Sequence, residues 1–130
     1  MNMSIAEYKE ITEGKKPSKY RNTRTKIDGI SFDSQAEARR YVELKTLKAV
    51  GDVIGFILQP RFILQEGFER DGEVVEKMEY VADFLIMWAD GRTTIEDVKG
   101  VRTDVYKLKV KLFERKYPRL SIIEVDSRGR

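Results

Sequence analysis

The chain contains no cysteine and no histidine among its 130 residues. Without cysteine it cannot form disulfides, thiolate zinc sites or a cysteine nucleophile. Without histidine it cannot use a serine–histidine triad, a histidine general base or a histidine-ligated zinc ion. Any catalysis by this chain must therefore depend on carboxylates, lysines, tyrosines and hydroxyls.

The sequence also lacks an apolar run of membrane-spanning length, and its first ten residues lack the apolar core of a signal peptide. We therefore expect no membrane partner and a cytoplasmic location. The hydrophobic content of 41% and the charged content of 36% indicate a globular chain rather than a disordered one. A chain of this length suits one hydrophobic core.

Positive charge is unevenly distributed, although the net charge is only +3. Basic segments at residues 15–26 and 102–119 flank a predominantly acidic stretch at residues 66–97. This pattern suits a protein that grips a polyanion and holds a cation where it acts. Solvated lysine-rich helices are the alternative explanation. The basic residues of the first segment are Lys15, Lys16, Lys19, Arg21, Arg24 and Lys26.

The first part of the chain is the least periodic. We expect a basic, mobile arm over residues 1–29, with a turn at residues 27–30, and a single domain over residues 30–130. Apolar residues at helical spacing predict a helix from residue 34 to residue 50. Ser34 followed by Glu37 matches a capping box, so the Glu37 carboxylate either caps this helix or takes part in a functional site.

Strand patterns follow this helix. Residues 53–58 and 61–65 predict two short strands, or one strand bent at Pro60. Residues 73–88 predict one long strand that is apolar on both faces, and such a strand is central and covered on both sides. Residues 93–99 predict a strand that returns antiparallel to it.

A second helix is predicted after Thr103, its expected N-cap, and ends at Pro118. Its buried stripe is expected to consist of Val105, Leu108, Leu112 and Phe113. A last strand over residues 120–125 can lie parallel to a core strand through this helical crossover. The expected fold class is therefore α/β, with a mixed sheet flanked by helices.

The loop between the two central strands decides whether two acids meet. A two-residue loop would place Asp97 opposite Phe84. A three-residue loop over residues 89–91, with its glycine in the left-handed conformation, would place Asp97 opposite Asp83. Opposed residues have Cβ atoms about 5 Å apart, so in this second register both carboxylates could bind one ion. Lys99 shares the face of Asp97 because side chains alternate along a strand.

The cluster of Asp83, Asp97 and Lys99 favours a hard cation, Mg²⁺ or Mn²⁺, because its acidic ligands are all oxygens. Such an ion could lower the pKa of a bound water and stabilise the charge that builds on a phosphate during hydrolysis. Lys99 would orient that water or neutralise the phosphate, and Glu37 could supply a further carboxylate. The alternative is a structural salt bridge of Lys99, which leaves one carboxylate unexplained.

The acids and the lysine occur in a recognisable order: Glu37 in a helix, Asp83 in YVADF, and Asp97 and Lys99 in IEDVKG. This order resembles the PD-(D/E)XK nuclease superfamily, whose restriction-endonuclease-like core has the order α-β-β-β-α-β. Residues 19–118 look like a phage-associated family of small proteins in that superfamily. Two departures are the alanine in YVADF, where the family motif has proline, and an aspartate where glutamate is commoner.

The resemblance implies a metal-dependent endonuclease whose active site contains Glu37, Asp83, Asp97 and Lys99. The Val98 carbonyl would be a further metal ligand beside Asp83 and Asp97. Small single-domain members include Holliday junction resolvases, which act as dimers because two symmetric strands must be cut. A homodimer, branched DNA as substrate and, for a phage protein, the host cytoplasm are thereby implied. The basic arm fits phosphate tracking, and Lys107 and Lys111 fit contacts beside the scissile phosphate.

Two other functions remain open from the sequence. The chain is either a nuclease-derived DNA-binding module without activity, in which the acidic cluster is structural, or a protein-interaction factor with no nucleic-acid role. Tyr20 and Tyr106 would stack on exposed bases in a DNA-binding protein, although ordinary packing accounts for both as well. Replacing an acid of the cluster separates the first of these from an enzyme, and salt-dependent DNA affinity separates the second.

Overall fold

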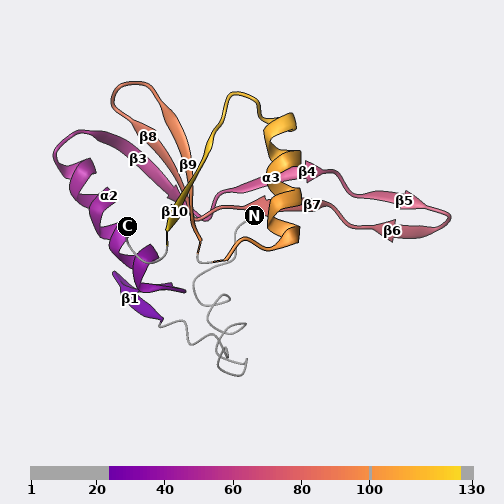
Figure 1. Ribbon diagram of the computed structural model, residues 1–130, viewed down its shortest axis with the longest axis horizontal. Coiled ribbons are helices and arrows are strands. Elements are labelled where there is room, and N and C mark those ends of the chain that lie inside the picture. The colour runs from indigo at the N-terminus through magenta and orange to yellow at the C-terminus, as the bar shows by residue number, and fades with distance from the viewer. Residues whose placement is uncertain (1–23, 100, 127–130) are drawn as a thin grey trace. The chain divides into compact units, whose positions relative to one another are not determined.

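The computed structural model describes residues 24–99 and 101–126 (Figure 1). The chain forms two compact units, residues 1–43 and residues 44–130. No helix within the described ranges has the length and apolarity that crossing a bilayer requires. The candidate acids and lysine from Asp83 to Lys99 all belong to the second unit.

A β-hairpin begins the described part of the first unit. Strands β1 (Thr25–Ile27) and β2 (Ile30–Phe32) pair antiparallel. Asp28 and Gly29 connect them with positive φ angles of 53° and 77°. Two successive positive φ angles suit a tight hairpin turn and favour Asp-Gly, so the turn predicted at these residues is confirmed. Strand β1 lies within the stretch expected as a mobile arm, of which residues 1–23 fall outside the described residues.

Helix α2 (Gln35–Ala49) follows the hairpin. The Ser34 hydroxyl accepts a hydrogen bond from the backbone N–H of Glu37 at 3.1 Å, which satisfies one of the free donors of the first turn. Gly51, with a φ of 91°, follows the end of the helix, where the left-handed conformation favours glycine. The predicted helix and its N-cap are therefore confirmed.

The second unit contains a four-stranded mixed sheet in the order β10-β9-β8-β3. Strands β3 (Val53–Leu58), β8 (Phe84–Trp88) and β9 (Thr93–Lys99) are antiparallel neighbours. Strand β10 (Ile122–Asp126) runs parallel to β9, and helix α3 (Asp104–Lys116) is the crossover between them. The mixed sheet with a parallel last strand is thus confirmed.

Strands β3 and β8 continue into a long two-stranded ribbon. Strand β4 (Arg61–Gln65) pairs with β7 (Met78–Val81), and β5 (Phe68–Arg70) pairs with β6 (Glu73–Val75). Figure 1 shows β5 and β6 extending outward from the ends of β4 and β7. The prediction of one strand over residues 73–88 is therefore wrong, because this segment forms three strands that belong to three sheets.

The ribbon bends where β3 gives way to β4 and β7 gives way to β8. Gln59 has a positive φ of 48°, and its N–H donates to the Asp83 carbonyl at 2.9 Å. Across the bend the Ala82 N–H donates to the Pro60 carbonyl at 3.2 Å. Both strands therefore turn together around Pro60, which has no N–H for a sheet ladder.

The bend reverses which side chains face helix α3. Before it, Tyr80 and Ala82 belong to the core that α3 covers, and after it Leu85 packs against that core. Regular alternation would have placed Phe84 there instead of Leu85. Asp83 stands at the reversal, between β7 and β8. The single strand predicted over residues 73–88 would have kept one alternation throughout, and the bend breaks it.

Aromatic side chains fill the space beneath α3. The Thr103 hydroxyl caps this helix by accepting from the Tyr106 N–H at 3.1 Å, as predicted. Phe113 is fully buried and packs edge-on to Phe62 with ring centroids 5.0 Å apart. The Tyr117 hydroxyl donates to the backbone of β4 at 2.9 Å. These contacts fix α3 on the ribbon of β4 and β7.

The predicted buried stripe of α3 is wrong for three of its four residues. Val105, Leu108 and Leu112 are 62%, 60% and 41% exposed, and only Phe113 is buried as expected. The helix has two apolar sides, and the aromatic side packs on the sheet because it buries more surface. The aliphatic side is left at the surface of the unit.

Candidate active site

The loop after β8 sets which residues face each other across β8 and β9. Gly91 has a φ of 95°, and the Trp88 N–H donates to the Arg92 carbonyl at 2.8 Å across a three-residue loop. Phe84 opposes Glu96, and the register stays regular from this pair to the pair of Met87 and Thr93 beside the loop. The register predicted for a three-residue loop is confirmed as far as Phe84 and Glu96. Asp83 lies one step beyond these paired residues, so its pairing with Asp97 stays a prediction.

Asp83 is tied to β9 through both its backbone and its side chain. Its N–H donates to the Glu96 carbonyl at 3.1 Å, and its Oδ2 accepts from the Val98 N–H at 2.7 Å. The carboxylate thus takes the place of a backbone carbonyl as the partner of Val98. Because the N–H and C=O of a strand residue point to the same neighbouring strand, the Val98 carbonyl faces the edge at which Asp83 lies.

Asp97 is almost completely buried, with 2% of its surface exposed. Its Oδ2 accepts from the Tyr80 hydroxyl at 2.5 Å, and its Oδ1 lies 3.3 Å from Lys99 Nζ. A buried carboxylate without partners would cost several kcal/mol, about 3–5 when a buried ion pair is broken. The phenol and the amine therefore explain how this acid is accommodated inside the strand.

Two tyrosines close the site on the side of α3. Burial, and next the hydrogen bond to Asp97, hold the pKa of Tyr80 far above its ordinary value, and the charge of Asp83 adds to this. Burial also raises the pKa of Tyr106, with the charge of Asp97 as the next cause. Both phenols therefore stay protonated at neutral pH, and that of Tyr80 donates to Asp97. Asp83 and Asp97 both act on Tyr80, which places the two acids in one electrostatic cluster.

Lys99 connects the buried carboxylate with the surface. Its side chain is 29% exposed, and its Nζ lies 4.4 Å from the centroid of the Tyr106 ring, where the ring quadrupole attracts a cation. The Tyr106 hydroxyl is buried and has no hydrogen-bond partner among the described residues. Leaving a buried hydroxyl without a hydrogen bond costs about 1–3 kcal/mol. A polar group or water bound beside Asp97 would therefore be stabilised by a hydrogen bond with Tyr106.

The donors at this edge suit a hard divalent cation. Mg²⁺ is commonly held by one or two carboxylates and keeps several waters, and the available donors are the carboxylates of Asp83 and Asp97 and the carbonyl of Val98. A water of the ion would also supply the partner that the Tyr106 hydroxyl needs. No cage of three or more histidine, cysteine, aspartate or glutamate side chains occurs within residues 24–99 and 101–126. A site here would rest on two carboxylates and on water.

The remaining predicted site residues lie elsewhere. Glu37 lies on α2 in the first unit. Its backbone N–H, not its carboxylate, donates the hydrogen bond to Ser34, so a role for the carboxylate stays a prediction. Arg24 lies 3.7 Å from Asp33, and Lys26 is exposed on β1. Lys107 and Lys111 are exposed one turn apart on α3. Outside the described residues lie Lys15, Lys16, Lys19, Arg21 and Tyr20.

Sequence reasoning missed Tyr80 as a partner of Asp97. A buried acid needs a donor, and a tyrosine three residues before Asp83 was the available signal. Tyr106 is 6% exposed, so the idea that it stacks on bases is wrong and packing accounts for it. Glu124 was also missed: it lies beside Asp97 in the parallel pairing and 3.0 Å from the guanidinium of Arg102.

Comparison with known proteins gives one family. Residues 17–126 match the model of a family described as "Protein of unknown function (DUF1064)". No curated protein and no solved structure matches the chain. The matched segment includes both opposed aspartates, Lys99 and helix α3.

Proposed function

The chain belongs to the DUF1064 family of proteins of unknown function, and from its own side chains we propose that it is a Mg²⁺- or Mn²⁺-dependent endonuclease. In this proposal it hydrolyses phosphodiester bonds in branched DNA, and its core is of the restriction-endonuclease-like, PD-(D/E)XK type. The observation that carries the proposal is the buried Asp97, held by Tyr80 and Lys99, across from Asp83.

Each residue of the site has a distinct task in the proposed reaction. Asp83, Asp97 and the Val98 carbonyl would hold the ion, which when bound would supply an activated water and neutralise charge on the phosphate. Tyr80 donates to one oxygen of Asp97 and so fixes the direction of the other. Lys99 is partly exposed and can exchange its contact with Asp97 for the phosphate or the attacking water.

A nucleic-acid substrate is supported by the charge of α3. Lys107 and Lys111 are exposed one turn apart in the N-terminal half of α3, the helix that carries Tyr106. Phosphate contacts by such lysines position a duplex without reading its sequence. This favours recognition of DNA shape, as a branched substrate requires.

The proposal is tested by incubating the protein with a four-way junction, a flap and a linear duplex in the presence of Mg²⁺. We expect cleavage of a branched substrate that stops when the ion is chelated. Asp97→Asn should lower the cleavage rate by at least about 10²-fold. Asp71→Asn is the matched control, because Asp71 is 94% exposed in the β5–β6 turn. A folded wild-type protein that cuts none of the three substrates would refute the proposal.

The burial of Asp97 favours a second candidate, a nuclease-derived DNA-binding module without activity. Both of its oxygens already have partners, Tyr80 and Lys99, as a structural ion pair would. In that case neither the wild-type protein nor the Asp97→Asn variant cuts DNA, and the substitution changes only the free energy of unfolding. In an enzyme the same variant loses cleavage while DNA binding persists.

A further inference from the structure

The hairpin of β5 and β6 has no hydrophobic core of its own. It is called the arm from here on, and it is distinct from the basic segment predicted over residues 1–29. Every residue of both strands is exposed. Phe68 and Val74 are 47% and 78% exposed, and Val75 and Met78 are exposed as well. A two-stranded hairpin by itself is marginally stable in water, and an exposed apolar patch marks a surface that binds another molecule.

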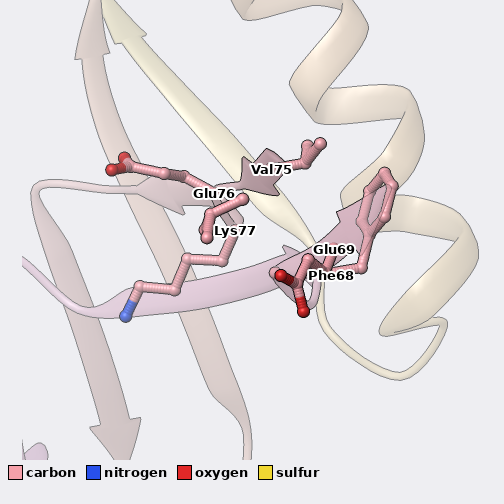
Figure 2. A pocket seen from close by; sticks show the side chains of 7 residues that line it. Phe68, Glu69, Val75, Glu76 and Lys77 are labelled. Atoms are coloured by element: carbon pink, nitrogen blue, oxygen red, sulfur yellow. The ribbon is translucent and has the colours of Figure 1, made fainter. Parts of the chain in front are cut away.

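The apolar side chains of the arm gather along a hollow. Phe68 and Val75 line it and point to one side in Figure 2, whereas Glu76 and Lys77 extend the other way. At the base of the arm a Cβ on Gly67 would meet the Val75 carbonyl oxygen at 3.2 Å. This close approach requires glycine and fixes how the arm leaves the ribbon.

The charge of the arm narrows the choice of partner. Residues 66–76 contain five acidic residues and one basic one. The acidic residues are Glu66, Glu69, Asp71, Glu73 and Glu76. Such a rim repels the phosphates of nucleic acids and of anionic lipids, and it favours an apolar surface with a basic border.

Helix α3 carries a surface of that kind. Val105, Leu108 and Leu112 form one exposed stripe, since residues three, four and seven apart share a helix face. Lys109 follows Val105 by four residues, and Arg115 and Lys116 follow Leu112 by three and four, so basic side chains border the stripe. Lys111 follows Leu108 by three residues and therefore lies on this border too, and Lys107 lies one turn before it.

We propose that the arm of one copy of the chain docks on the α3 stripe of a second copy. Because each copy has both surfaces, the contact forms twice around a two-fold axis and closes a homodimer. The apolar residues of the arm cover Val105, Leu108 and Leu112, and the acidic rim meets Lys109, Arg115 and Lys116. This inference does not depend on the proposed nuclease activity.

The test is sedimentation equilibrium of the full chain over a series of concentrations. The wild-type protein should approach twice its 15.2 kDa mass. Phe68→Lys places a positive charge on the arm that the basic border repels, and Leu108→Glu places a negative charge on the stripe that the acidic arm repels. Each variant should raise the dimer dissociation constant by at least about tenfold. Both sites are exposed, and circular dichroism checks that the variants fold.

Mixing the two variants identifies the contact. A pair of Phe68→Lys with Leu108→Glu keeps one native arm-to-helix contact and gains a Lys–Glu contact, so the equimolar mixture should regain the dimer. Ile54→Lys on β3, at a residue 65% exposed, is the matched control and should leave the mass unchanged. A wild-type protein that stays monomeric throughout the series, a variant that dimerises like the wild type, or a mixture that stays monomeric would each overturn the proposal.

Discussion

Lys99 and Asp97 show how unequal the two members of a buried ion pair can be. Asp97 is 2% exposed and Lys99 is 29% exposed, so the amine reaches water when it loses its partner but the carboxylate does not. Removing the amine alone therefore leaves a charge inside the protein. Removing both charges leaves none.

We therefore predict that Lys99→Met lowers the free energy of unfolding by about 2–4 kcal/mol, because Asp97 is left without a counter-ion. Adding Asp97→Asn to it should recover part of the loss. The control is Lys77→Met, since Lys77 is 52% exposed beside Glu79 and such pairs contribute about 0–1 kcal/mol. Urea unfolding measures all four proteins. Equal losses at Lys99 and Lys77 would contradict the burial argument.

Tyr80 should make the stability of the protein sensitive to alkaline pH. Burial and the bond to Asp97 raise its pKa in the folded protein above the ordinary 10.0. Its contribution is therefore complete below about pH 10, the pKa of the unfolded chain, and is lost as the pH rises beyond it. Tyr106 shifts in the same direction.

We predict that the free energy of unfolding falls above about pH 10 by up to about 1.4 kcal/mol per pH unit for each of the two tyrosines. Tyr80→Phe should make this fall shallower while lowering stability near neutral pH by about 1 kcal/mol through the lost hydrogen bond. Urea unfolding at a series of pH values measures both effects. Identical alkaline slopes for the two proteins would show that Tyr80 has no raised pKa.

At the scale of elements, the loop between β8 and β9 determines whether the two acids meet. Gly91 has a φ of 95° and open space around its Cβ position, so alanine there is disfavoured by the backbone alone. We predict that Gly91→Ala lowers the free energy of unfolding by about 1–2 kcal/mol. Lys48→Ala, at an exposed lysine of α2, is the control for a substitution outside the sheet. An unchanged stability for Gly91→Ala would argue against the three-residue loop.

The same loop shows what local sequence can predict. Asp90 and Gly91 predict a turn, but a left-handed glycine fits a two-residue loop as well as a three-residue one, as Asp28 and Gly29 show. The sequence therefore predicted the turn and left two registers open. The helix ends were also predictable, since Ser34 and Thr103 carry the capping hydroxyls. These features depend on neighbouring residues alone.

Features that depend on distant contacts were not predictable. The bend at Pro60 reverses the alternation in a partner strand more than twenty residues later in the chain, and only that reversal brings Tyr80 to Asp97. Helix α3 has an aliphatic side and an aromatic side, and periodicity does not say which one meets the sheet. The choice is made by the aromatic residues Phe62 and Tyr80 on β4 and β7, which pack against Phe113.

At the scale of the whole molecule, charge is divided between an acidic arm and basic segments. If Lys107 and Lys111 contact phosphates, DNA affinity should fall steeply with salt. We predict that Lys107→Ala and Lys111→Ala each reduce the slope of log affinity against log salt by about 1. Lys48→Ala, at an exposed lysine of α2, should leave the slope unchanged. Fluorescence anisotropy with a labelled junction measures the slopes, and equal slopes for all three variants would remove α3 from the DNA interface.

The pairing of Asp83 with Asp97 around one divalent ion is tested most directly by a crystal grown with Mn²⁺ and measured for anomalous scattering. We predict a peak about 2.1 Å from carboxylate oxygens of both aspartates, with the Val98 carbonyl turned toward it and Lys99 moved away from Asp97. A crystal with no such peak, in which Asp97 keeps its contacts to Tyr80 and Lys99, would contradict the account.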